Sequence, residues 1–204
     1  MYRFHPQIDV LKREIKSGKI GKILHMNDRF VFRLTNKHNI RLNKELGGGA
    51  LLDVGCYCIN GARLIFESEP KDAIAWSRIG PDNGVDETTI GVLKFPNQLT
   101  LGFECSLLSP YSNSLEVIGT EGVITSNKPF RIGAEESPEI KVWKDHSRSG
   151  KPEVIKSRLG DHYKLMVEHF SECVIRDVEP RYPPADALAN IRAIEMVQVA
   201  TRRR

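Results

Sequence analysis

Residues 47–66 have the sequence GGGALLDVGCYCINGARLIF, in which three consecutive glycines lead into a mostly apolar run. The run is long enough for a helix, and it leads into Glu69-Pro70, where the proline cannot continue a helix. Glycines without a side chain allow a ligand or another backbone segment to approach closely. The sequence therefore predicts a helix over residues 50–66, entered from a glycine run.

Period-two patterns surround this helix and predict strands. Upstream, residues 23–34 alternate in polarity, with Asp28 the exception on an otherwise apolar face. Downstream, residues 70–145 form short β-rich runs separated by turn sequences such as Gly80-Pro81-Asp82-Asn83-Gly84. The cleanest alternation lies in residues 98–106, which predict a strand with one core face and one polar or partner-facing side. The expected core residues of that strand are Leu99, Leu101, Phe103 and Cys105.

Helices are predicted at both ends of the chain. The first helix follows His5-Pro6. Residues 147–157 are rich in Gly, Lys and Ser and are expected to be a loop. Two helices close the chain, each with an apolar face. The face of the first comprises Tyr163, Met166, Val167, Phe170 and Val174, and that of the second comprises Ala187, Ile191, Ile194 and Val197.

Together these elements predict an α+β fold with an open, largely antiparallel sheet and helices packed on one face. A bare sheet face exposes an apolar patch, so we expect the other face to be available for dimerisation.

The composition excludes several function classes. The 204 residues are 40% hydrophobic and 27% charged, and the 30 basic and 26 acidic residues are mixed along the chain. A nucleic-acid-binding protein usually concentrates its basic residues in a stripe, so we expect no nucleic acid partner. No run approaches the roughly 20 apolar residues of a membrane span. The four cysteines follow no metal-binding or disulfide spacing, which favours a metal-free chain in a reducing cytoplasm.

Asp53 and Tyr57 are the residues most able to carry chemistry. In a helix they lie at i and i+4 on one face, and a carboxylate beside a phenol can orient a substrate hydroxyl and exchange its proton. The alternative is structural: Asp53 complements the helix dipole, and Tyr57 is half-buried with its hydroxyl bonded. The spacing alone leaves both interpretations open.

The glycine run does not match a dinucleotide fingerprint. G-x-G-x-x-G starting at Gly47 needs glycine or alanine where this chain has Leu52, and the βαβ context is missing. The sequence therefore offers no nucleotide-binding motif of its own.

Several motifs, in order along the chain, resemble those of the Gfo/Idh/MocA oxidoreductases. MYRFHPQ at residues 1–7 resembles the segment that follows the nucleotide domain, and GGGALLDVGCYC at residues 47–58 resembles the family's G-G-G-x-L-x-D-x-G-x-[HY] signature. Residues 84–88, 119–122 and 184–187 fall where the family has similar sequences. The resemblance is to the xylose and dihydrodiol dehydrogenase branch.

The resemblance implies that residues 1–204 are a single substrate-binding and dimerisation domain, without the N-terminal nucleotide-binding domain. Asp53 and Tyr57 match two of the family's three catalytic positions, and the third, a lysine, belongs to the missing domain. We expect the complete enzyme to use NAD or NADP on a sugar, a polyol or a dihydrodiol. This chain alone is expected to bind neither nucleotide and to be inactive. A separate Rossmann-domain polypeptide is a possible partner.

Three further residues are candidates for substrate contact. The resemblance places Tyr2 and Arg3 at the domain junction, with plain packing of the N-terminal segment as the alternative. Arg78 precedes a hairpin and could reach a substrate hydroxyl or carboxylate, or lie solvated on its strand. A different function for the whole chain, a non-catalytic sugar-binding or dimeric scaffold module, is also compatible with the sequence.

Overall fold

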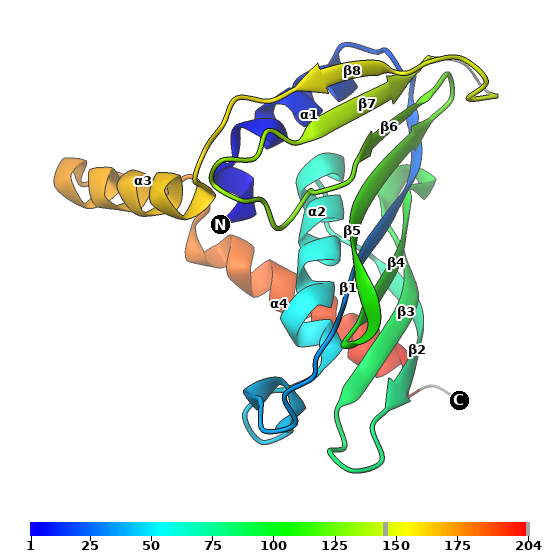
Figure 1. The fold of residues 1–204 in the computed structure, drawn as a ribbon, viewed down its shortest axis with the longest axis vertical. Coiled ribbons are helices and arrows are strands. Elements are labelled where there is room, and N and C mark those ends of the chain that lie inside the picture. The colour runs from blue at the N-terminus through cyan, green and yellow to red at the C-terminus, as the bar shows by residue number, and fades with distance from the viewer. Residues whose placement is uncertain (145–146, 203–204) are drawn as a thin grey trace. The chain divides into compact units, whose positions relative to one another are not determined.

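The computed structural model describes residues 1–144 and 147–202 of the chain (Figure 1). Short helical turns are labelled η. In chain order the elements are η1 (Tyr2–Phe4), α1 (Pro6–Lys16), β1 (Ile23–Arg33), η2 (Ile40–Leu42), η3 (Leu51–Gly55), α2 (Cys56–Phe66), β2 (Asp72–Ile79), β3 (Asp86–Lys94), η4 (Pro96–Gln98), β4 (Thr100–Ser106), β5 (Leu108–Gly119), β6 (Val123–Ser126), β7 (Glu139–Trp143), β8 (Glu153–Lys156), α3 (His162–Arg176) and α4 (Pro184–Ala200).

The strands form one open sheet in the order β2-β3-β4-β1-β5-β6-β7-β8. β1 runs parallel to β4, with Phe30 opposite Cys105. The pairs β2–β3, β3–β4, β5–β6, β6–β7 and β7–β8 are antiparallel. The predicted α+β class with an open, largely antiparallel sheet is therefore confirmed.

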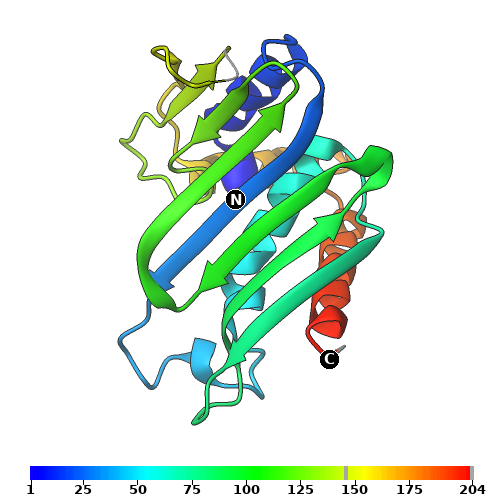
Figure 2. The same cartoon turned by 90° about the vertical axis from the view of Figure 1, so that its right-hand side faces the viewer.

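The chain divides into two compact units. Unit 2 comprises Leu24–Asn113 and the chain from Leu188 onward. Within it, α2 and α4 cover one face of β1–β4, and Figure 2 shows the face that no helix covers. The covered face holds the core of the unit, in which Met26, Leu101, Ile59 and Val197 are fully buried. The predicted alternation is confirmed over residues 100–105, where Leu101, Phe103 and Cys105 are buried. The ends of the predicted strand are wrong, because Leu99 precedes β4 and is only half-buried, and Ser106 is buried although it was expected on the polar side.

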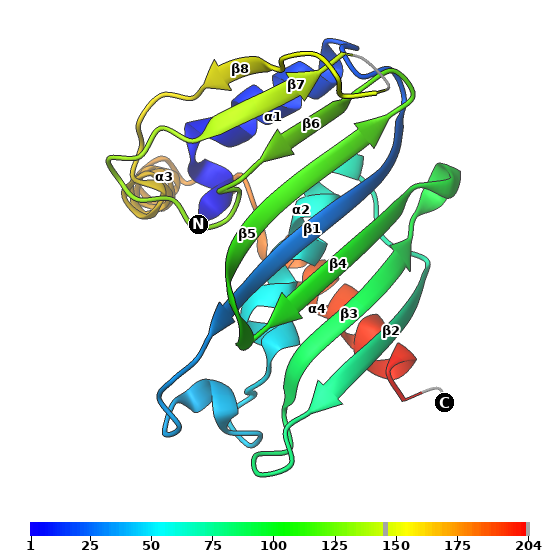
Figure 3. The same cartoon turned by 45° about the vertical axis from the view of Figure 1, so that its right-hand side comes forward.

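Unit 1 comprises Met1–Ile23 and Ser114–Ala187. In this unit α1 lies against β7, with β6 and β8 on either side of that strand in the sheet (Figure 3). Ile8 and Leu11 of α1 are buried, as the periodicity predicts. The loop expected over residues 147–157 is partly wrong, because Glu153–Lys156 forms the edge strand β8, which pairs with β7.

The last two helices form as predicted, but most of the apolar residues on their predicted faces are exposed. The helices exist, but α3 buries only His162 and Cys173, and most of its apolar stripe is exposed. In α4 the buried residues are Ala193, Ile194, Val197 and Ala200, whereas Ala187 and Ile191 are exposed. Periodicity identifies the apolar face of a helix but not whether another element covers it.

Two buried histidines lie together in unit 1. His5 and His162 are 1% and 2% exposed, with ring centroids 6.2 Å apart. Burial lowers the pKa of His5 from 6.5 to about 4, and the neighbouring His162 contributes to the shift. Burial also lowers the pKa of His162. The His5 Nδ1 atom accepts a hydrogen bond from the Gln7 N–H at 3.1 Å and so caps α1.

We expect His5 to make the chain acid-sensitive. The pKa of His5 is about 4 in the folded chain and 6.5 in the unfolded chain, so the unfolded chain binds a proton at a higher pH than the folded chain does. The contribution of neutral, buried His5 to the free energy of unfolding is therefore present above pH 6.5 and is lost as the pH falls toward about 4. His5→Asn keeps a hydrogen-bond acceptor that caps the helix but cannot take up a proton in this pH range. Between pH 7 and pH 4 we expect this variant to lose roughly 2–3 kcal/mol less of its free energy of unfolding than the wild type loses. Thermal unfolding between pH 7 and pH 4 measures this difference, with the exposed His38→Asn as control. Parallel pH profiles for wild type and His5→Asn would contradict the prediction.

Candidate active site

The three glycines close onto the turn that precedes them in unit 2. The N–H groups of Gly48 and Gly49 donate to the carbonyl oxygens of Asn43 at 2.8 Å and Arg41 at 2.9 Å. A Cβ atom on Gly48 would lie 2.5 Å from the Arg41 carbonyl oxygen. The close approach that glycine permits is therefore used here by the chain's own backbone.

Asp86, at the start of β3, fixes the start of the helical segment. Its carboxylate accepts hydrogen bonds from the Leu51 N–H at 2.7 Å and from the Thr89 hydroxyl at 2.9 Å. Burial raises the pKa of Asp86. Gly49 has φ +123°, and a Cβ atom there would lie 2.0 Å from Asp86 Oδ1. Gly49 and Asp86 are therefore in close contact, and Asp86 also bonds the Leu51 N–H at the start of the helical segment.

The segment that carries Asp53 is a π turn rather than an α-helix. The turn spans Leu51–Gly55, and the Cys56 N–H donates to the Leu51 carbonyl oxygen five residues back. The α-helix α2 begins only at Cys56. The predicted helix over residues 50–66 is therefore correct in extent, but its first turn is wider than expected. Such π turns are frequent at functional sites.

Asp53 lies beside a pocket and pairs with an arginine. Arg41 Nε donates to Asp53 Oδ2 at 2.7 Å, which fixes the orientation of the carboxylate. Both residues line a pocket of about 200 Å³, together with Ile40, Leu46, Leu52 and the three glycines. The side chain of Asp53 keeps 22% of its surface exposed, so a ligand in this pocket could reach it. Arg41 is a residue of this site that no sequence motif predicted.

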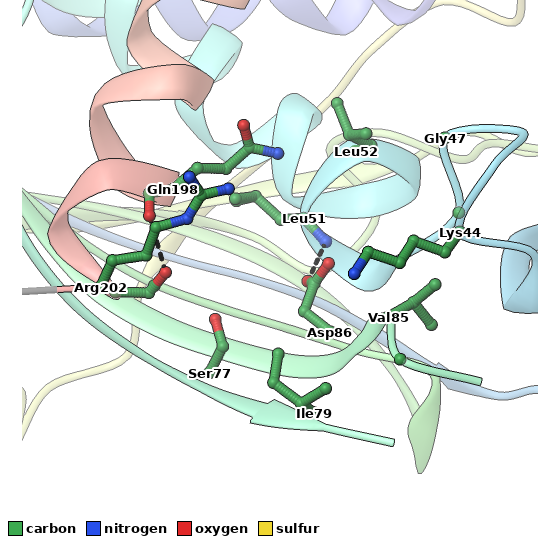
Figure 4. A pocket seen from close by; sticks show the side chains of 13 residues that line it. Lys44, Gly47, Leu51, Leu52, Ser77, Ile79, Val85, Asp86, Gln198 and Arg202 are labelled. Carbon is green, nitrogen blue, oxygen red and sulfur yellow. Dashed lines mark hydrogen bonds between the residues drawn. The ribbon is translucent and has the colours of Figure 1, made fainter. Parts of the chain in front are cut away.

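Tyr57 lies in the first turn of α2, four residues after Asp53. It is half-buried, and its ring meets Phe30 of β1 edge-to-face, with centroids 5.5 Å apart. A second pocket of about 560 Å³ shares Gly47 and Gly48 with the first and is lined by Lys44, Asp86 and Arg202 among others (Figure 4). Asp53 lines the smaller pocket, whereas Tyr57 lines neither of the two.

Of the three other residues predicted to contact the substrate, Tyr2 and Arg3 belong to unit 1 and Arg78 belongs to unit 2. In unit 1, Tyr2 is 3% exposed and packs against Phe130 at 5.2 Å between ring centroids. Arg3 pairs with Asp186 and lies 3.7 Å above the Tyr182 ring. In unit 2, Arg78 lies on β2 with its side chain 70% exposed. The structure thus shows packing partners for Tyr2 and Arg3, and their contact with a substrate stays a prediction, as does that of Arg78.

The cysteine beside the site, Cys56, is held in its neutral thiol form. Burial raises the pKa of Cys56 to about 12, and the nearby Asp53 charge adds to the shift. Burial likewise raises the pKa of Cys58 and Cys105. Raised pKa values favour the neutral thiol form of all three cysteines at neutral pH.

The residues around the glycine loop do not fit a dinucleotide. A pyrophosphate is normally bound by free backbone N–H groups at the start of a helix. Here the N–H groups of Gly48 and Gly49 are bonded to backbone oxygens, and the Leu51 N–H is bonded to a carboxylate. Among the described residues no group of three or more His, Cys, Asp or Glu side chains could hold a metal ion.

Comparison with known proteins assigns the family. The model of the GFO/IDH/MocA C-terminal domain matches residues 8–125, and the chain belongs to this family. The D-xylose 1-dehydrogenase (NADP(+)) 2 of Haloferax volcanii is 28% identical over 198 residues, which are 97% of this chain. The trans-1,2-dihydrobenzene-1,2-diol dehydrogenase of Bos taurus is 30% identical over 121 residues, covering 59% of this chain and 36% of that protein. The predicted family is therefore confirmed.

Solved structures share the fold. The aldose-aldose oxidoreductase of Caulobacter crescentus, complexed with glycerol, has a TM-score of 0.87 at 22% identity and covers 98% of this chain. A 3-ketoreductase of Actinomadura kijaniata, complexed with NADP and TDP-benzene, has a TM-score of 0.89 at 23% identity, also over 98% of this chain.

The chain spans only part of these relatives. It covers 59% of the length of the Haloferax protein and 60% of each of the two solved chains. Within the described residues, no helix has the length and apolar character to cross a membrane.

Proposed function

We propose that this chain is the substrate-binding and dimer-forming half of an NAD(P)-dependent dehydrogenase that oxidises a sugar, a polyol or a dihydrodiol. The observation that carries the proposal is the position of Asp53, on a π turn beside a pocket, with Tyr57 in the next turn of the same helical segment. The names of the relatives, a xylose dehydrogenase and dihydrodiol dehydrogenases, support this substrate class.

Asp53 and Tyr57 have complementary roles in this proposal. The Asp53 carboxylate, held by Arg41, accepts a hydrogen bond from the substrate hydroxyl and orients it. The Tyr57 hydroxyl exchanges the proton of that hydroxyl as its carbon is oxidised. The redox chemistry belongs to a nucleotide held outside this chain, since the glycine loop does not fit one.

The chain therefore needs a nucleotide-binding domain, on the same or on another polypeptide. We expect no NAD(P)H formation by the 204-residue chain with xylose or a dihydrodiol, and turnover once it is joined to the nucleotide-binding domain of a relative. Absorbance of the reduced nicotinamide measures both. Micromolar binding of NAD or NADP by the chain alone would contradict the proposal.

A sugar-binding or scaffold module without catalysis is the second candidate, favoured by the misfit between the glycine loop and a dinucleotide. Sugar binding by the joined protein without turnover would support this second candidate instead.

All four cysteines are free thiols, which agrees with the reducing cytoplasm that we propose as the location of the protein.

The dimer that we propose forms across the uncovered sheet face of unit 2. Ile74 and Trp76 of β2 and Ile90 and Val92 of β3 are exposed there, and the register places Ile74 opposite Val92 and Trp76 opposite Ile90. Four adjacent apolar side chains form a contiguous patch of the kind that marks interfaces.

Trp76→Asp is expected to convert this dimer into a monomer, because a charge in the centre of the patch must be desolvated on association. Trp76 is 57% exposed, so the fold of the monomer should be unaffected. Light scattering coupled to size-exclusion chromatography measures the mass, with Val154→Asp on β8 as the matched control. A dimer that survives Trp76→Asp would exclude this face as the interface.

A further inference from the structure

The pocket of about 560 Å³ belongs wholly to unit 2. The end of α4 and the loop that carries Lys44 form two of its sides, and β2 and β3 form its base (Figure 4). Small-molecule sites typically have volumes of roughly 300–1,000 Å³, so the pocket is large enough for a ligand of its own. Asp53 and Tyr57 do not line it, and the proposed catalytic function therefore assigns it no ligand.

Two cations line this pocket from different elements. Lys44 lies in the loop before the three glycines, and its aliphatic chain passes Gly84, since a Cβ atom there would be 3.6 Å from Lys44 Cδ. Arg202 follows α4, and its N–H donates to the carbonyl oxygen of Val199 at 3.1 Å. Figure 4 shows the two side chains extending toward the pocket from opposite sides. Among the residues that the structure describes, no carboxylate pairs with either cation, so both charges are available to a ligand.

The described residues of the lining include one acidic residue, Asp86. Its carboxylate already accepts hydrogen bonds from the Leu51 N–H and the Thr89 hydroxyl. Burial raises the pKa of Asp86, which weakens its preference for the charged form. Two cations against one carboxylate give the lining a net positive charge, and this charge favours an anionic ligand.

The remaining lining combines apolar and hydrogen-bonding groups. Ile79 offers apolar surface, and Ser77 and Thr201 offer hydroxyl groups. The Thr201 hydroxyl donates to the Gln198 carbonyl oxygen at 2.8 Å, so its oxygen can still accept a hydrogen bond. The side-chain amide of Gln198 can both donate and accept. Such a lining suits a carbon skeleton that carries several hydroxyl groups better than it suits a hydrocarbon.

We propose that this pocket binds a small sugar that carries one anionic group, a carboxylate or a phosphate. Lys44 and Arg202 attract the anionic group, since charge-assisted hydrogen bonds to an oxyanion are the strong ones. Gln198 and Thr201 bond hydroxyl groups, and Ile79 contacts the carbon skeleton. The inference is independent of the proposed dehydrogenase function, in which none of these residues has a role.

Isothermal titration calorimetry of the 204-residue chain tests the proposal with gluconate, glucose 6-phosphate, glucose and inorganic phosphate. We expect one or both sugar anions to bind, and the tighter of the two identifies the anionic group. Glucose and inorganic phosphate should bind at least about tenfold more weakly, because each lacks one of the two recognised features.

Lys44→Ala and Arg202→Ala should each weaken binding of the sugar anion by about tenfold or more, which corresponds to the loss of one hydrogen bond to a charged group. Lys71→Ala and Arg192→Ala are the matched controls, because both residues are exposed, belong to the same unit and lie outside the pocket. All four variants should unfold at the wild-type temperature, since each replaces an exposed side chain.

Hydrogen–deuterium exchange locates the bound anion. Binding should slow exchange in residues 47–52 and 198–202, which line the pocket from its two sides. Arg41→Ala removes the cation of the smaller pocket beside Asp53 and should leave the affinity for the sugar anion unchanged.

Four results would overturn the proposal. They are the absence of binding by both sugar anions, affinity that survives Lys44→Ala and Arg202→Ala, and equally tight binding of glucose or inorganic phosphate. The fourth is affinity that is lost in Arg41→Ala, which would place the anion beside Asp53 instead. Binding that is lost in the two pocket variants and kept in Arg41→Ala, with protection on both sides of the pocket, supports it.

Discussion

Tyr57→Phe should lower kcat/KM of the enzyme completed with a nucleotide-binding domain by about 100-fold to 10,000-fold, the range for loss of a general acid–base. The substitution removes only the hydroxyl. The ring contact with Phe30, 5.5 Å between centroids, remains available to phenylalanine, so the packing of α2 on β1 should be preserved. The loss in rate then reports on proton exchange rather than on folding.

The size of this effect depends on the missing domain. A free phenol has a pKa near 10, so only about one in a thousand is ionised at pH 7. A neighbouring cation stabilises the phenolate and favours proton transfer. The family resemblance places the required lysine in the nucleotide-binding domain, so the hydroxyl of Tyr57 should matter little in the chain alone and greatly in the joined enzyme.

Steady-state kinetics of the joined wild type and Tyr57→Phe measure the effect, and thermal unfolding verifies that both are folded. Tyr111→Phe is the matched control, because it removes a phenolic hydroxyl from an exposed residue of β5. Turnover of Tyr57→Phe within threefold of the parent would show that Tyr57 is not the proton-exchanging group.

Most of the fold follows from local sequence patterns. The alternation of polarity predicted the strands β1 and β4, and the apolar run after the glycines predicted a helical segment that contains α2. The π turn at the start of that segment was not predicted. The short strand β8 escaped prediction, because its Gly-, Lys- and Ser-rich surroundings resemble a loop and it is held only by pairing with β7. The exposure of α3 could not be foreseen, since an apolar stripe predicts a partner without identifying it.

The candidate site was only partly visible in the sequence. A motif of adjacent residues identified Asp53 and Tyr57. Arg41 and Asp86 were missed because their bonds to this segment join residues 12 and 35 positions apart, and no local pattern encodes such contacts. The polar loop before the three glycines contains Arg41, and its nearness to the motif was a signal for a site residue. Sequence spacing alone could not show that Arg41 pairs with Asp53.

Gly49→Ala is expected to destabilise the fold by about 3–5 kcal/mol, because two costs add. A non-glycine residue at φ +123° costs roughly 1–3 kcal/mol in backbone strain. The new Cβ atom would also lie 2.0 Å from Asp86 Oδ1 and displace the carboxylate. Displacement leaves the buried Leu51 N–H without its acceptor, at a cost of about 1–3 kcal/mol.

Gly84→Ala separates these two costs. Gly84 also has a positive φ, +67°, but a Cβ atom there would lie 3.6 Å from Lys44 Cδ, an ordinary contact. Its substitution should therefore cost only the strain of a left-handed residue, about 1–2 kcal/mol. Urea denaturation of both variants measures the free energies of unfolding. Equal losses would show that the contact between Gly49 and Asp86 does not hold the glycine loop in place.

The double variant Gly49→Ala/Asp86→Ala gives the sharper result. Asp86→Ala alone removes the acceptor of the Leu51 N–H, but it also opens the space that the Cβ atom at position 49 would fill. The two substitutions should therefore be non-additive. The double variant should lose less free energy of unfolding than the two single variants lose together, by at least about 1 kcal/mol. Strict additivity would mean that the loop and the carboxylate act independently, and that Asp86 does not position the turn that carries Asp53.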